Sequence, residues 1–369
     1  MSDVDIGRQA RHATDLLQVV TEADQHLRGP DQLHWATVLR QERDALDDAI
    51  DWATSQDQRL ALELVAGLST YWWMHGLRNE AAQAASRLLD ALGAEVPDGL
   101  AEEYLLAVLH AAADARADQV EQAQAIVLQT SEPFRRPVTV LLWSMVLGPF
   151  TSPELVDEVL ARNERSTDPW TLAALQICHA YPGLTTGSEA TLESAYAGFQ
   201  LVGDRWGSSL ALSALAEQAA WATQYERSAE LISEALVIAG GLGNEEEAAS
   251  LLCRRADLRL RLRDLHTASD DYRQALVRAN RVGVLDTSAA ARLGLARAAR
   301  YGGDLAKAQE LALVALSRCP EDWDDADLAM TEALGELAAI AAAAGRPDEA
   351  HSWRLKAGLV SEQYRPAGL

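Results

Sequence analysis

The side chains that could do chemistry are few and widely spaced. The eight histidines never fall three to five residues apart, the spacing of paired zinc ligands on one helix, and no HExxH occurs. The sequence also lacks a GxSxG nucleophile elbow, a GxGxxG loop and a phosphate-binding GxxxxGK[ST] loop. We therefore expect a chain that is not an enzyme and that uses neither a metal nor a cofactor.

The net charge and the cysteines limit which partners the chain is expected to bind and in which cellular compartment it is expected to occur. A formal net charge of -23 and a pI near 4.7 oppose direct binding to nucleic acid and to anionic membranes. The three cysteines, Cys178, Cys253 and Cys319, form no CxxC pair and are expected to be small buried hydrophobes in a reducing compartment. The first residues are charged and no apolar run of about 18 residues follows, so we expect a soluble, cytoplasmic protein.

A period of 40 residues organises the second half of the chain. Turns begin at Gly203, Gly243 and Gly283, and each turn closes one helix-periodic apolar run and precedes another. Small side chains let two crossing helices approach, and they return here in a constant register. The three series are Ala216, Ala256, Ala296; Ser228, Ala268, Ala308; and Ala235, Ala275, Ala315.

This register predicts the fold. The composition is rich in Ala, Leu, Arg and Glu, which favours helix nearly everywhere. Helical hairpins that bury their apolar faces by stacking on their neighbours are typical of tetratricopeptide arrays. We therefore expect an all-α fold, a right-handed superhelix of tetratricopeptide-like helical hairpins with a repeat of about 40 residues.

Upstream of Gly203 the period weakens, although helices continue. Leu33 to Thr54 is predicted to be one long amphipathic helix. The stretch Pro133 to Pro153 contains four prolines and is expected to be an irregular joint. The predicted organisation is a helical segment over residues 1–95, with the long helix and a first hairpin, followed by the superhelical array over residues 96–369.

The N-terminal part of the sequence resembles a known family. The run from His26 to Ala53, HLRGPDQLHWATVLRQERDALDDAIDWA, is followed by the aromatic cluster Tyr71-Trp72-Trp73 and then by Gly76-Leu77-Arg78-Asn79-Glu80. Together they resemble the effector region of AfsR-type (SARP/STAND) bacterial transcriptional regulators, specifically over residues 8–92. The resemblance implies a tetratricopeptide sensor. In that family a DNA-binding module and a nucleotide-binding module come first, and this sequence contains the motifs of neither.

The concave face of the array is the first candidate site. In tetratricopeptide arrays the first helix of each hairpin lines this face, at positions fixed by the register of the small residues. The residues selected in this way are Glu217, Trp221, Arg254, Asp257, Arg261, Arg297, Arg300 and Tyr301. Arginines beside aromatic residues suit an anionic partner, and Arg254, Arg261, Arg297 and Arg300 could add their charges. Alternatively, these arginines pair with carboxylates of adjacent helices, such as Glu217 and Asp257.

A second candidate site is aromatic. Trp72 and Trp73 are adjacent on a predicted helix, so their side chains point about 100° apart and one of them can face a groove while the other enters the core. With Trp170 they could line an aromatic pocket, and core packing is the alternative for all three.

Three functions are compatible with these patterns. The predicted one is a non-catalytic sensor and protein-interaction module of a transcriptional regulator. Its concave groove would bind a peptide, a protein segment such as the regulator's own upstream domains, or a small effector. The alternatives are a scaffold or oligomerisation array without a ligand, and a small-molecule receptor with a closed pocket near the tryptophans.

Overall fold

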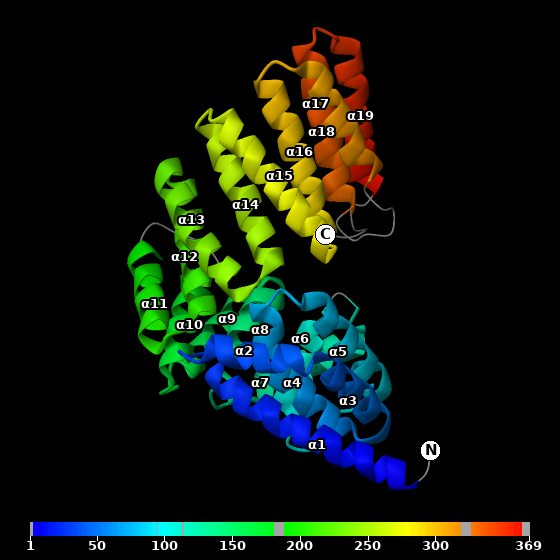
Figure 1. The fold of residues 1–369 in the computed structure, drawn as a ribbon, viewed down its shortest axis with the longest axis vertical. Coiled ribbons are helices and arrows are strands. Elements are labelled where there is room, and N and C mark those ends of the chain that lie inside the picture. The colour runs from blue at the N-terminus through cyan, green and yellow to red at the C-terminus, as the bar shows by residue number, and fades with distance from the viewer. Residues whose placement is uncertain (1–2, 94, 113, 181–187, 319–325, 364–369) are drawn as a thin grey trace. The chain divides into compact units, whose positions relative to one another are not determined.

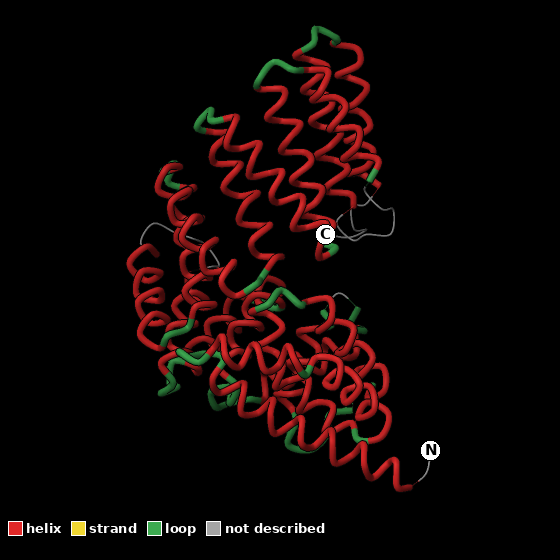
Figure 2. The backbone as a smooth tube through the Cα atoms, viewed as in Figure 1, coloured by secondary structure: helices red, strands yellow, loops and turns green. Residues whose placement is uncertain are grey.

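A computed structural model of the chain describes residues 3–93, 95–112, 114–180, 188–318 and 326–363. Every regular element in these ranges is a helix, as Figure 2 shows. The all-α prediction is therefore confirmed. None of the helices in these ranges is long and apolar enough to cross a lipid bilayer.

The helices form two compact units, residues 1–215 and 216–369, and the division falls inside α12 (Arg205–Trp221). A division after residue 95 was expected from the sequence. The helices on either side of that point, α5 (Arg78–Leu92) and α6 (Ala101–His110), pack against each other within the first unit.

In the first unit α4 (Gln58–Met74) is the central helix. It is apolar around most of its circumference, which is the pattern of a helix buried on all sides, and it packs against α1, α3, α5 and α6. Gly67 of α4 faces Val20 of α1 so closely that a Cβ atom there would lie 2.5 Å from the Val20 Cγ1 atom. The other helices of the unit are α1 (Asp3–His26), α2 (Gln32–Gln41), α3 (Arg43–Gln56), α7 (Ala117–Gln129), α8 (Pro137–Val146), α9 (Pro153–Asn163), α10 (Pro169–Ala180) and α11 (Ser188–Val202).

The segment predicted as one long helix, Leu33 to Thr54, is two helices. α2 ends and α3 begins at Glu42, whose φ of -90° and ψ of 7° lie outside the helical range. Apolar residues continue at helical spacing across Glu42, so their pattern shows no break.

The proline-rich stretch is more regular than predicted. Between Pro133 and Pro153 the chain forms α8 and a short 3-10 helix, η1 (Gly148–Phe150), and α9 begins at its end. Pro137 and Pro153 both stand in the first turn of a helix, where the missing N–H has no intrahelical partner to lose. These two prolines therefore start helices instead of breaking them.

The second unit keeps the 40-residue register. Its helices lie side by side in Figure 1, and consecutive helices pack against each other. They are α13 (Tyr225–Leu242), α14 (Glu245–Arg261), α15 (Leu265–Val282), α16 (Leu285–Tyr301), α17 (Leu305–Ser317), α18 (Ala326–Ala343) and α19 (Pro347–Gln363). The small residues predicted at the helix crossings, such as Ala256, Ala275 and Ala296, are fully buried.

Turn residues define the ends of these helices. Gly243 and Gly283 follow α13 and α15 with φ of 70° and 76°, a left-handed conformation that glycine adopts without a steric penalty. Asn244, Asp264 and Asp304 begin α14, α15 and α17, and the side chain of each accepts a hydrogen bond from a backbone N–H of the first turn. The repeat thus encodes both the packing of the helices and where they start and stop.

Candidate ligand-binding site

A cavity of about 380 Å³ lies in the second unit, where the first helices of three hairpins contact one another. Its walls come from α14, α16 and α18, with one residue from α17. The lining residues are Ser250, Cys253, Arg254, Asp257, Asp286, Thr287, Ala289, Ala290, Leu293, Ala315, Leu328, Ala329, Glu332 and Ala333.

Small side chains create this cavity. Ala289 and Ala290 of α16 and Ala329 and Ala333 of α18 end at their Cβ atoms, so the facing helices leave space between them. The lining is mostly apolar and carries four charged groups, Arg254, Asp257, Asp286 and Glu332. An apolar concavity with a few polar groups is the usual form of a ligand site in proteins.

Asp257 is held in the cavity wall by a hydrogen bond from Tyr272. The Tyr272 hydroxyl donates a hydrogen bond to the Asp257 Oδ1 atom, and the buried Tyr272 ring lies over Gly294, where a Cβ atom would come within 2.2 Å of the ring. The carboxylate is open to solvent through the cavity, yet surrounding protein desolvates it enough to raise its pKa. The same burial, together with the Asp257 charge, raises the pKa of Tyr272, which therefore stays a hydrogen-bond donor.

The charges on this face are largely compensated. Arg300 forms two hydrogen bonds to the buried Glu336, from Nε at 2.6 Å and from Nη2 at 3.1 Å. Arg297 pairs with Glu332, with 3.2 Å between Nη2 and Oε2. The expectation that four arginines add their charges on one open face is therefore corrected, because α18 supplies carboxylates to two of them. Pairing of arginines with adjacent carboxylates was the alternative, and for Arg297 and Arg300 these carboxylates belong to Glu332 and Glu336.

The other predicted groove residues lie away from the cavity lining. Trp221, Arg261 and Tyr301 occupy equivalent positions at the last residues of α12, α14 and α16, and Glu217 is half-buried on α12. The Arg261 guanidinium lies 5.6 Å from the Tyr225 ring centroid, and Arg300 lies 4.6 Å from the ring centroid of Tyr301. Of the eight predicted residues, the cavity brings together Arg254 and Asp257.

The three predicted pocket tryptophans belong to two separate clusters in the first unit. Trp72 packs edge-on against His110, and the Trp73 Nε1 atom donates to the His110 Nδ1 atom at 3.4 Å. Trp170 is buried elsewhere, stacked on Trp206, and it donates from Nε1 to Asp204 at 2.6 Å. Trp72 and Trp170 are therefore buried in the core, which was the alternative for these residues, whereas Trp73 is half-buried.

A serine and a histidine meet in the first unit, but not as a catalytic pair. The Ser69 Oγ and His110 Nε2 atoms are 2.8 Å apart. Because His110 Nδ1 accepts from Trp73, the proton lies on Nε2 and the histidine donates to Ser69. Ser69 in turn is within 3.3 Å of the Val65 carbonyl oxygen, and both residues are buried. His110 therefore cannot accept the serine proton as a general base in this arrangement.

Several cavity residues were missed by the sequence analysis. Ala338 of α18 corresponds to Ala256 of α14 and Ala296 of α16, and Glu332 occupies the second position of the register counted from it. Extending the register to this fourth hairpin therefore finds Glu332. Asp286 lies before the first register position that selects the concave face, and no other sequence pattern marks it as a site residue. Cys253 lines the cavity but is only 7% exposed, and burial raises its pKa, so its thiol is unreactive. Cys178 is also buried, with a pKa raised to about 11, and Cys319 lies outside the described residues.

Comparisons with known proteins place the fold in a class. No family model matches the sequence, and no curated protein matches it. Among solved structures, the STAND signal-transduction ATPase with a tetratricopeptide repeat sensor from Pyrococcus horikoshii gives a TM-score of 0.62 at 14% identity. That match covers 92% of this chain and 53% of the ATPase chain.

Two further structures match nearly the whole chain. The Rap protein complexed with Competence and Sporulation Factor gives a TM-score of 0.52 at 11% identity, covering 98% of this chain and 99% of that one. A monomeric mutant of IFIT1 with m7Gppp-AAAA gives 0.52 at 14% identity, covering 98% and 83%. At such identities the likeness shows the fold alone, an all-helical repeat fold of the tetratricopeptide type.

Proposed function

We propose that this chain is a non-catalytic sensor and protein-interaction module of a bacterial transcriptional regulator, and that the cavity of the second unit is its ligand site. The ligand would be a peptide, a protein segment or a small effector. Its binding would change how the module engages the rest of the regulator, in the cytoplasm.

The cavity carries this proposal. Its volume of about 380 Å³ falls within the range of roughly 300–1,000 Å³ that is usual for ligand sites. Three successive hairpins contribute to it, so a ligand there contacts α14, α16 and α18 at once. Occupancy can then favour one arrangement of the stack over another, which is how a repeat array couples binding to its partners.

Two resemblances support the regulatory part of the proposal. Residues 8–92 resemble the effector region of AfsR-type regulators, and the STAND ATPase from Pyrococcus horikoshii carries a tetratricopeptide repeat sensor. The Rap protein of similar fold is complexed with Competence and Sporulation Factor. The net charge of -23 disfavours RNA as the ligand of this chain, although the similar IFIT1 structure contains m7Gppp-AAAA.

Thermal unfolding in the presence of fractionated bacterial extract tests the proposal. A ligand present at about one hundred times its Kd adds about 2.7 kcal/mol to the free energy of unfolding, so an active fraction should raise Tm by a few degrees. The Ala290→Trp variant places an indole in the cavity and should lose this shift. The Ala306→Trp variant adds the same side chain at an exposed position of α17 and should keep it.

The two variants separate a cavity ligand from other effects. An equal shift for both variants would place the ligand elsewhere and overturn the proposed site. If no fraction shifts even the unmodified protein, the scaffold alternative is favoured. Each variant is first compared with the unmodified protein without ligand, so that a general loss of stability is recognised.

A further inference from the structure

The charges that line the cavity are mostly negative. Asp257, Asp286 and Glu332 come from three successive first helices, α14, α16 and α18, and Arg254 is the positive residue of the lining. Arg297 adds a second positive charge beside the cavity through its pairing with Glu332 at 3.2 Å. The lining itself therefore carries three carboxylates and one guanidinium group, an excess of negative charge around one small volume, while Arg297 and Arg261 act on Asp257 from outside the lining.

The Asp257 carboxylate is a partly desolvated anion in this lining. Desolvation raises its pKa, the hydrogen bond from Tyr272 and the charges of Arg297 and Arg261 lower it, and the nearby charge of Glu332 raises it. A cationic group placed in the cavity would offset the desolvation and the charge of Glu332 at once. The excess of acidic residues over the whole chain would also draw a cationic ligand toward the molecule.

The apolar part of the lining requires that the ligand also has an apolar portion. Ala289, Ala290 and Leu293 of α16 face Ala329 and Ala333 of α18 across the cavity. Lysine and arginine combine a methylene chain with a cationic end, so their side chains can pack on these alanines while the charge reaches a carboxylate. The hydroxyls of Ser250 and Thr287 are also in the lining, where they can exchange hydrogen bonds with the amides of a peptide backbone.

We infer that the cavity takes the lysine or arginine side chain of a basic peptide segment whose neighbouring residues are apolar. This inference rests on the proposed function, because it names the ligand class of the same site. The positions of the arginines in the sequence predicted an anionic partner. The inferred ligand is cationic instead, because carboxylates from α16 and α18 outweigh Arg254.

Binding of three matched peptides to the full chain tests the inference. The probe is a fluorescein-labelled six-residue peptide of alternating leucine and lysine, measured by fluorescence anisotropy. One control peptide carries acetylated lysines, which keep the apolar body and remove the charge, and the other carries glutamate in place of lysine. We expect the lysine peptide to bind and both controls to bind at least about tenfold more weakly, because a charge-assisted hydrogen bond is lost.

Matched protein variants show whether the binding occurs in the cavity. The double variant Asp257→Asn with Asp286→Asn should weaken binding of the lysine peptide about tenfold, while an asparagine oxygen still accepts from Tyr272. The control double variant Asp270→Asn with Glu310→Gln removes the same charge from α15 and α17 and should change binding less than about twofold. Arg254→Ala should leave binding unchanged or strengthen it.

The outcomes distinguish this inference from the proposed function. Equal losses in the two double variants would mean nonspecific attraction to an acidic protein and overturn the inference. If the glutamate peptide binds instead and Arg254→Ala abolishes that binding, the cavity remains a ligand site but the ligand is anionic. If the free amine agmatine binds in the cavity as tightly as the lysine peptide, the occupant is a small amine and not a peptide segment. Absence of cavity-dependent binding by any probe at about 1 mM, the weak end of specific affinity, would overturn the inference, and the proposed function would then be decided by the extract fractions and the Ala290→Trp variant.

Discussion

His110 is a buried histidine whose environment keeps it neutral. Desolvation lowers its pKa to about 3, and its two ring nitrogens bond to Ser69 and Trp73. An unfolded histidine has a pKa near 6.5, so between pH 6.5 and 3 the unfolded chain binds a proton that the folded chain does not. The contribution of neutral His110 to the free energy of unfolding is therefore fully present above about pH 7 and is lost as the pH falls.

This linkage gives a prediction at the scale of one residue. Between pH 7.5 and pH 5 the unmodified protein should lose about 2 kcal/mol more free energy of unfolding than the His110→Gln variant, which cannot titrate there. Urea denaturation at the two pH values measures the difference directly. Titration of all other groups is common to both proteins and cancels in the comparison. Equal losses in the two proteins would mean that His110 is protonated in the folded state.

A group of three charged residues stands out at the scale of the repeat element. The buried Asp271 of α15 accepts two hydrogen bonds from Arg255, each of 2.8 Å, and one of 2.5 Å from Arg259. The neighbouring repeats carry apolar residues at all three positions. They are Leu215, Ala219 and Leu231 in the preceding repeat and Leu295, Ala299 and Leu311 in the following one. One repeat therefore holds an ion cluster where its neighbours hold an apolar contact.

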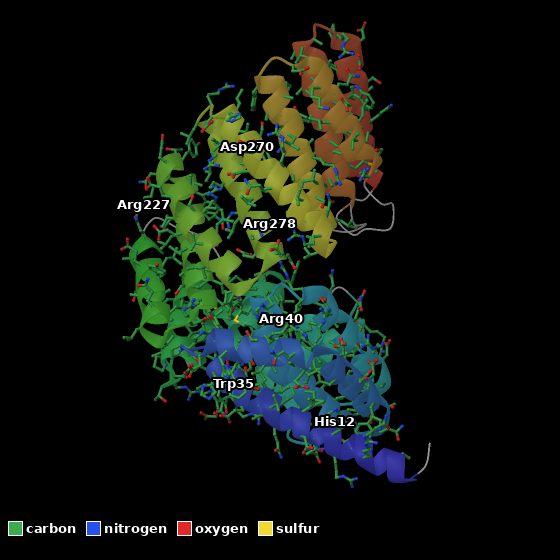
Figure 3. The ribbon with its side chains drawn as sticks, in the orientation of Figure 1. His12, Trp35, Arg40, Arg227, Asp270 and Arg278 are labelled. Atoms are coloured by element: carbon green, nitrogen blue, oxygen red, sulfur yellow. The ribbon has the colours of Figure 1, made fainter. Side chains whose placement is uncertain are left out.

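Removing one charged residue from this cluster should lower the free energy of unfolding, whereas replacing all three residues by apolar ones should not. Asp271→Ala leaves Arg255 and Arg259 without their carboxylate and should lower the free energy of unfolding by about 3–5 kcal/mol. Asp270→Ala is the matched control. Asp270 is labelled in Figure 3, pairs with Arg273 at 2.6 Å and is partly exposed, so its loss should cost less than about 1 kcal/mol.

A triple variant checks the reason for that cost. Combining Arg255→Leu, Arg259→Ala and Asp271→Leu installs the residues of the neighbouring repeats, and an apolar replacement of a buried ion cluster is often neutral or stabilising. We expect the triple variant to recover most of the stability lost in Asp271→Ala. If the triple variant is as unstable as the single one, the cluster supports the fold in a way that apolar packing cannot replace.

The helical repeat could be predicted because its signals are local. Glycines at the turns and alanines at the crossings recur every 40 residues, and each acts on helices close to it in sequence. The break at Glu42 and the helices begun by Pro137 and Pro153 were missed, because spacing alone does not reveal a cap or distinguish a proline that starts a helix from one that ends it.

The candidate site was predicted less well, because its charges come from long-range pairing. The register placed Arg254 and Asp257 on the face that bears the cavity. That Arg297 and Arg300 are neutralised depends on how α18 lies against α16, and Glu332 and Glu336 are 35 and 36 residues away from them in sequence. A two-residue insertion lengthens this repeat, so the register gives the face on which Glu332 lies but not the arginine with which it pairs.

At the scale of the molecule, stability should depend on the hairpin at the end of the second unit. Leu337 and Ile340 of α18 are buried against Ala308 and Ala312 of α17, in a cluster that also includes Ala296 of α16. Truncation after Arg318 exposes this apolar surface and removes Glu332 and Glu336 from Arg297 and Arg300. A repeat array needs a terminal element with a polar outer face, so the truncated chain should aggregate and unfold at a lower temperature. Truncation after Gln363 is the control and should leave Tm unchanged. Light scattering and thermal unfolding of the two truncated proteins measure aggregation and Tm. A soluble chain ending at Arg318 with an unchanged Tm would contradict the stacking of α18 on α17 as a source of stability.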